Sequence, residues 1–152
     1  MKTLSSILTG VAGEYFVAAE LSRRGFVATL TLRNTRGIDI LASNADATKS
    51  VGIQVKTSQG TRPDWILNAK AEMDVAENLF YVFVRLPAQG EPAFYVVPRP
   101  VVAAQVRDAH TKWRETPGRK GQQHGVSNIR KFNDPDGKYK DQWDLLGLSE
   151  VI

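Results

Sequence analysis

Residues 52–60, GIQVKTSQG, form a strand-like run that carries polar side chains where apolar ones would be expected. Valine and isoleucine at 51, 53 and 55 alternate with Gln54 and Lys56. This period of two predicts a β-strand with one apolar and one polar face. A polar residue inside an otherwise apolar strand needs a hydrogen-bonding partner or a purpose.

A second strand-like run, TRGIDILAS at 35–43, lies upstream and is interrupted by Asp39. The segment NADATKS that follows has turn chemistry and is expected to close a hairpin between the two strands. If residues whose numbers sum to roughly 94 face each other, Asp39 lies opposite position 55, beside Gln54 and within reach of Lys56. Gln54 and Lys56 share a face, and a one-residue change of register would move Asp39 to the other face.

An aspartate, an amide carbonyl and a lysine gathered in this way suit a hard divalent cation. Magnesium prefers oxygen ligands and keeps several waters, which can attack phosphorus. A neighbouring lysine can orient such a water or neutralise charge on the phosphate in the transition state. The alternative is an ion pair between Asp39 and Lys56 at the ends of two strands, with Gln54 exposed on a sheet edge.

The rest of the chain predicts a single α/β domain over residues 1–152 with a mixed sheet. The most apolar run, 79–86, is typical of a buried central strand. Residues 60–76 are compatible with a short strand, a helical turn or a loop. The other predicted elements are an amphipathic helix at 5–24, strands at 26–32, 38–43, 51–57 and 93–98, a helix at 101–115 and a short helix at 142–148.

The composition limits the possible functions. The 152 residues include no cysteine, which excludes a disulfide scaffold and a cysteine nucleophile and is compatible with the cytoplasm. Only two histidines are present, so a zinc site has no support. No stretch approaches the ~20 apolar residues of a membrane span, and no membrane partner is expected.

The positive charge is concentrated in the C-terminal third. The formal net charge is +4, and residues 107–141 contain nine Lys or Arg against five Asp or Glu. The segment at about 116–141 is predicted to be a long basic loop, and loops of that length in compact domains are usually functional or disordered. Such a surface favours an anionic partner such as DNA.

These motifs resemble the PD-(D/E)XK nuclease superfamily, which includes restriction endonucleases and archaeal-type Holliday junction resolvases. The resemblance is carried by GIDI and IQVK behind a helix that contains GEYFVAAEL. It implies a restriction endonuclease-like core of helix, three antiparallel strands, helix and strand, flanked by helices. It also implies that Glu14 matches the helix glutamate, Asp39 the metal-binding aspartate and Lys56 the catalytic lysine. Gln54 stands where most members have Glu or Asp.

The leading hypothesis is a DNA endonuclease that uses Mg²⁺ or Mn²⁺ to hydrolyse phosphodiester bonds. Asp39, Gln54 and Glu14 are the expected metal ligands, and Lys56 is expected to assist the attacking water. The alternative is a nuclease-like DNA-binding module that is weakly active or inactive because of Gln54. Cleavage of both strands would favour a homodimer. The residues expected to hold the DNA backbone are Arg33, Arg36, Arg119, Lys120, Arg130 and Lys131.

Overall fold

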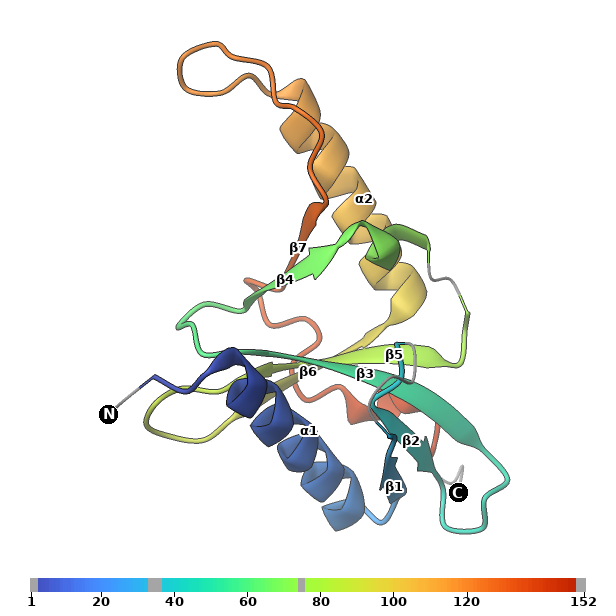
Figure 1. Cartoon of the computed structure of the whole chain (residues 1–152). Coiled ribbons are helices and arrows are strands. Elements are labelled where there is room, and N and C mark those ends of the chain that lie inside the picture. The colour runs from blue at the N-terminus through green and yellow to red at the C-terminus, as the bar shows by residue number, and fades with distance from the viewer. Residues whose placement is uncertain (1–2, 33–36, 74–75, 150–152) are drawn as a thin grey trace.

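A five-stranded mixed sheet forms the centre of the structure (Figure 1). The computed structural model describes residues 3–32, 37–73 and 76–149. The strand order is β1-β2-β3-β5-β6; β3 and β5 are parallel, and the other neighbours are antiparallel. The buried strand β5 therefore lies inside the sheet, as predicted. The strands are β1 (Val27–Leu30), β2 (Ile40–Ser43), β3 (Ser50–Ser58), β5 (Leu79–Arg85) and β6 (Ala93–Pro98).

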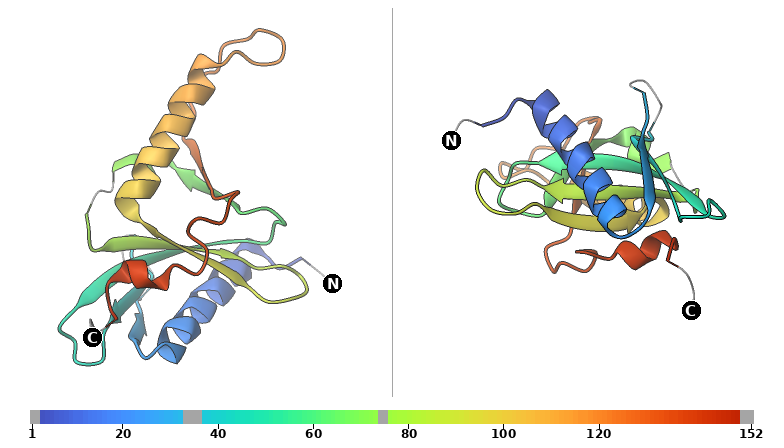
Figure 2. Two further views of the ribbon diagram at one scale, coloured as in Figure 1. Left: turned by 180° about the vertical axis from the view of Figure 1, so that it is seen from behind. Right: turned by 90° about the horizontal axis from the view of Figure 1, so that it is seen from below.

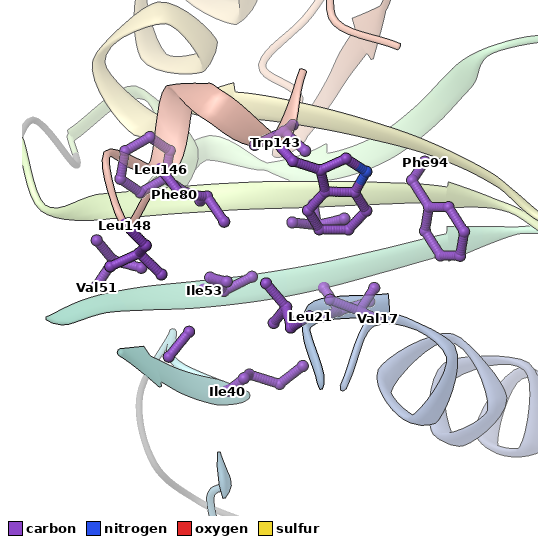
Figure 3. Packing of buried hydrophobic residues seen from close by; sticks show 14 of the residues in the cluster. Val17, Leu21, Ile40, Val51, Ile53, Phe80, Phe94, Trp143, Leu146 and Leu148 are labelled. Atoms are coloured by element: carbon purple, nitrogen blue, oxygen red, sulfur yellow. The ribbon is translucent and has the colours of Figure 1, made fainter. Parts of the chain in front are cut away.

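One face of the sheet is covered by helix α1 (Ser6–Arg23), whose N-cap residue Ser5 accepts the backbone N–H of Leu8. The buried stripe of α1 packs against the apolar face of β3. The short 3₁₀ helix η2 (Trp143–Leu146) joins the same core cluster. Figure 3 shows its Trp143 beside Phe94, whose ring centroid lies 5.6 Å away.

The other face carries helix α2 (Arg99–Glu115) and a two-stranded ribbon of β4 (Asp64–Asn68) and β7 (Ile129–Asn133). The 3₁₀ helix η1 (Ala69–Met73) connects β4 to the chain leading into β5. A second core cluster fills this side, with Phe83 of β5 stacked on Phe132 of β7 at 4.5 Å. The views in Figure 2 show the sheet between α1 on one side and α2 with the ribbon on the other.

The ribbon differs from the sequence prediction. Residues 116–141 are not one long loop, because β7 lies within them and pairs with β4 from Asp64 to Asn68. In β7, Arg130 and Phe132 are buried while their neighbours are exposed, so burial alternates with the period of two of a strand. The alternation is hard to see in the sequence, because one of the two buried residues is an arginine. The helix that the resemblance implied between the third and fourth core strands is replaced by β4 and η1.

Helix α1 approaches β3 closely at Gly13, where a Cβ atom would lie 2.9 Å from Cβ of Thr57 and closer still to its hydroxyl. Threonine is stiff at χ1, so α1 would have to move away from the sheet. We expect Gly13→Ala to destabilise the protein by about 1–3 kcal/mol through overpacking. Gly10→Ala, in the same helix with open space around it, should stabilise it by roughly 0.5–1 kcal/mol. Chemical denaturation of the two variants checks the contrast, and equal effects would contradict this packing.

Candidate active site

Asp39 lies at the level of Gln54, at the beginning of β2. Its backbone N–H donates to the carbonyl of Ile53 at 2.8 Å, and its Oδ2 accepts the N–H of Val55 at 2.7 Å. The ladder that follows pairs Ile40 with Ile53, so the observed register differs by one residue from the predicted one. Continued to Asp39, the observed register sets it opposite Gln54, on the polar face of β3, whereas the predicted register set it opposite Val55. The carboxylate is thus held beside Gln54, and no hydrogen bond joins its second oxygen, Oδ1, to another of the residues that the structure describes.

Gln54 and Lys56 lie on the face of β3 that is turned toward α2. They pair with Tyr81 and Phe83 of β5, whose rings belong to the core cluster under α2. Because β3 runs between β2 and β5, Gln54 is not on a sheet edge. Among the described residues no ion pair joins Asp39 to Lys56. The structure therefore disagrees with both parts of the alternative interpretation, the simple ion pair and the exposed amide.

A cleft of about 530 Å³ opens beside these residues, between the sheet and the segment formed by β4 and η1. Three cationic side chains line it, Lys56, Lys70 and Arg99, and the described lining contains no carboxylate. Gln54, Asn68 and Tyr81 add polar groups to the lining of the cleft. A cavity with this lining suits an anion, and a phosphate group matches both the charges and the donors.

Arg99 is the residue that sequence reasoning missed. It is 3% exposed, and its Nη2 donates to Oε1 of Gln54 at 3.2 Å and to the carbonyl oxygen of Gly37. Its guanidinium also lies 5.0 Å from the centre of the Tyr81 ring. Arg99 is the first residue of α2, where the helix dipole disfavours a cation. The helix was predicted to begin at residue 101, two residues after Arg99, so a cation next to that start is a sequence signal that could have identified it.

The pKa shifts at the site reflect burial and the charge of Asp39. Burial raises the pKa of Tyr81 to about 12, and the nearby Asp39 carboxylate acts in the same direction. Burial lowers the pKa of Arg99, and Asp39 partly offsets this effect by favouring the charged guanidinium. Asp39 is therefore electrostatically coupled to the residues of the cleft, although it does not line the cleft itself.

Glu14 lies on α1. This helix packs on the apolar face of β3, and Gln54 lies on the opposite face of that strand. It is half-buried and follows Gly13, which contacts Thr57 next to Lys56. Glu14 is not among the residues that line the cleft. Its assignment as a metal ligand stays a prediction.

The cationic residues expected to hold DNA have different surroundings. Arg119, Lys120 and Lys131 are exposed. Arg130 is 8% exposed; it pairs with Glu72 through Nε, and its Nη1 donates to the carbonyl groups of Ser127 and Ile129. Because it is buried and bonded inside the protein, we remove Arg130 from the set that we expect to contact phosphate. Arg33 and Arg36 lie outside the described residues.

The donor set near Asp39 fits a divalent ion in chemistry but is poor in charge. The described part of the chain contains no group of three or more His, Cys, Asp or Glu that could hold a metal. Asp39 Oδ1 and Gln54 Oε1 are hard oxygen donors of the kind that Mg²⁺ prefers. They supply one negative charge, and the Gln54 oxygen already accepts a bond from Arg99. The residues therefore suit a weakly held ion.

The sheet order, the covering helices and the polar residues on β2 and β3 define the restriction endonuclease-like class of α/β folds, as the sequence predicted. The bacterial homing endonuclease I-Ssp6803I is similar in structure, with a TM-score of 0.58 and 13% identity over 95% of this chain and 94% of that one. The Holliday junction resolvase Hjc from Archaeoglobus fulgidus gives a TM-score of 0.49 and 18% identity over 86% of each chain.

At these identities the likeness concerns the fold. No model of a protein family matches the sequence, and no curated protein matches it. None of the helices within the described ranges is long and apolar enough to cross a membrane.

The buried phenol of Tyr81 predicts a specific loss of stability at high pH. Between the ordinary pKa of 10.0 and the raised pKa of about 12, Tyr81 ionises in the unfolded chain but stays neutral in the folded one. The unfolded state then binds fewer protons, so stability falls as the pH rises, by up to about 2.7 kcal/mol in total. Tyr81→Phe should remove this part of the loss in denaturation curves between pH 9 and 12. A variant with the parent's pH dependence would contradict the burial of the phenol.

Proposed function

We propose that the protein is a DNA endonuclease that hydrolyses phosphodiester bonds with Mg²⁺ or Mn²⁺. The observation that carries this proposal is the placement of Asp39, Gln54 and Lys56 at one point of β2 and β3, beside a cleft lined by three cations. An oxygen-ligand site next to an anion-binding cleft is the combination that phosphodiester hydrolysis requires.

Each residue has a role in this proposal. Asp39 Oδ1 and Gln54 Oε1 would hold the metal, and Glu14 of α1 would add a second carboxylate. A divalent ion held there would supply Lewis acidity for attack on phosphorus. Lys56 lies two residues after Gln54, on the same face of β3. It would neutralise charge on the phosphate in the transition state. Lys70 and Asn68, on the far wall of the cleft, hold the phosphate in place.

DNA is the proposed substrate because a similar fold occurs in a homing endonuclease and because the exposed cations extend beyond the cleft. Figure 1 shows the end of α2 and the segment leading to β7 projecting from the body of the protein. This arm carries Arg119 and Lys120 and leads to Lys131. These residues would contact the DNA backbone outside the cleft, and Arg33 and Arg36, which lie outside the described residues, stay in the proposed set.

A homodimer stays part of the proposal, since two active sites would serve the two strands of a duplex. Helix α1 exposes four large apolar side chains, Ile7, Leu8, Tyr15 and Phe16. Exposed apolar side chains on a surface helix suit contact with a second copy.

The second candidate function is a DNA-binding module that does not cut. The observation in its favour is the bond between Arg99 and the oxygen of Gln54, since it uses one of the two proposed metal ligands. Both candidates predict salt-dependent DNA binding, and only the first predicts metal-dependent cleavage.

Cleavage of plasmid and branched DNA with Mg²⁺, Mn²⁺ or EDTA separates these functions. We expect cleavage only with metal and a loss of at least about 100-fold in Asp39→Asn, which keeps an acceptor for the Val55 N–H but removes the charge. Gln54→Glu should tighten metal binding and preserve cleavage, and Gln54→Leu should abolish both. Binding without cleavage under every condition would leave the second function. Full activity of Gln54→Leu would show that Gln54 is not a ligand.

Two adjacent residues of β7 separate DNA contact from stability. Lys131→Ala should weaken DNA binding similarly across sequences and reduce its salt dependence by roughly one unit, with little effect on folding. Arg130→Ala leaves the carboxylate of Glu72 and two carbonyl groups without their donor, and should cost about 1–3 kcal/mol of stability. Fluorescence anisotropy in a salt series and denaturation curves check both. Unchanged DNA affinity in Lys131→Ala would remove β7 from the interface.

A further inference from the structure

The guanidinium of Arg99 is a buried cation at the centre of the site. Burial of a charged group is unfavourable unless that group has specific partners, and a cation at a helix N-terminus also opposes the helix dipole. An apolar side chain would pack on the Tyr81 ring without these costs. The partners of Arg99 therefore matter, and two of them are the carbonyl of Gly37 and Oε1 of Gln54.

The Gln54 oxygen is the point of conflict between Arg99 and a metal ion. Arg99 Nη2 donates to this oxygen at 3.2 Å, and the same oxygen is a proposed metal ligand. A divalent ion bound there would be within a few ångströms of the guanidinium, where the two positive charges repel strongly. Arg99 and the metal therefore compete for Gln54 and for the charge of Asp39.

The cleft offers Arg99 another partner. Arg99 lines the cleft together with Lys56 and Lys70, so a phosphodiester group that enters it comes within reach of the guanidinium. Arginine binds phosphate oxygens in a bidentate manner, and this contact is stronger than a bond to a neutral amide. A bound phosphate also adds negative charge to a site that otherwise has little.

We propose that Arg99 is a positioning residue that holds Gln54 in the free protein and turns to the DNA phosphate when substrate enters the cleft. Release of Gln54 then allows the metal to bind, so metal affinity depends on DNA. This inference rests on the proposed function, because it assumes that Asp39 and Gln54 are metal ligands. Arg99 thereby sets the order of binding: DNA binds first, and the metal ion binds second.

Calorimetry with Mn²⁺ tests the proposal, in the free protein and with a short DNA duplex. All proteins carry Lys56→Ala, so that the DNA stays intact. We expect Mn²⁺ to bind the Arg99-containing protein at least about tenfold more tightly with DNA than without it. Arg99→Met, which keeps an apolar stem over Tyr81, should bind Mn²⁺ at least about tenfold more tightly without DNA and lose most of the DNA dependence.

Lys70→Met is the matched control. Lys70 lines the same cleft, but its ammonium group makes no hydrogen bond to Gln54, which is bonded to Arg99. It should leave Mn²⁺ affinity in the free protein within about threefold, since its removal changes only the general charge of the cleft. An equal gain in Lys70→Met and Arg99→Met would overturn the specific role of Arg99. So would an Arg99→Met protein that binds Mn²⁺ no more tightly than its parent.

A second measurement needs no variant at Arg99. The side-chain NMR signals of Arg99 should shift when the duplex is added without metal, and signals unchanged by bound DNA would overturn the proposal even if Arg99→Met does not fold. Failure of the proposed function gives a different result. In that case no protein binds Mn²⁺ at Asp39, with or without DNA, and Asp39→Asn has no effect on the titration.

Discussion

The bond between the Val55 N–H and Oδ2 of Asp39, 2.7 Å long, is the interaction on which the site depends. It ties the beginning of β2 to β3, the nine-residue strand that pairs with both β2 and β5. The bond holds a carboxylate beside Gln54 at a position where a regular ladder has only backbone groups. Helix α1 packs on one face of the sheet and α2 on the other. The apolar face of β3 therefore meets the core under α1, and its polar face is turned toward α2 and the cleft.

The balance of charge gives the site its chemical character. Many metal sites are built from several carboxylates, whereas here Asp39 lies close to a cleft that Lys56, Lys70 and Arg99 line. Positive charge of this kind attracts a phosphodiester before it attracts a metal ion. The substitution of an amide for a carboxylate at Gln54 and the buried guanidinium of Arg99 act in the same direction. In the account proposed here, the substrate itself completes the metal site.

The sequence predicted the parts of the structure that depend on local pattern. Alternation in 52–60 and the apolar run at 79–86 identified the two central strands because neighbours along a strand alternate between faces. The predicted register was wrong by one residue: Ile40 pairs with Ile53, and alternation within each strand does not specify the length of the turn that sets this pairing. Arg99 was missed because its contact with Gln54 joins residues 45 positions apart.

The surroundings of Arg130 depend on a long-range contact in the same way. Arg130 was expected to contact the DNA backbone, but it is 8% exposed and pairs with Glu72, 58 positions away. The period of the segment alone could not indicate that partner.

Anomalous scattering from crystals of the protein with Mn²⁺ and a DNA duplex tests the central claim most directly, since it locates the metal without relying on activity. The account predicts one manganese peak within ligand distance of Asp39 Oδ1 and Gln54 Oε1, with the Arg99 guanidinium on a phosphate rather than on Gln54. A peak that lies away from Asp39, or a bound duplex that leaves Arg99 on Gln54 with manganese already in place, would contradict it.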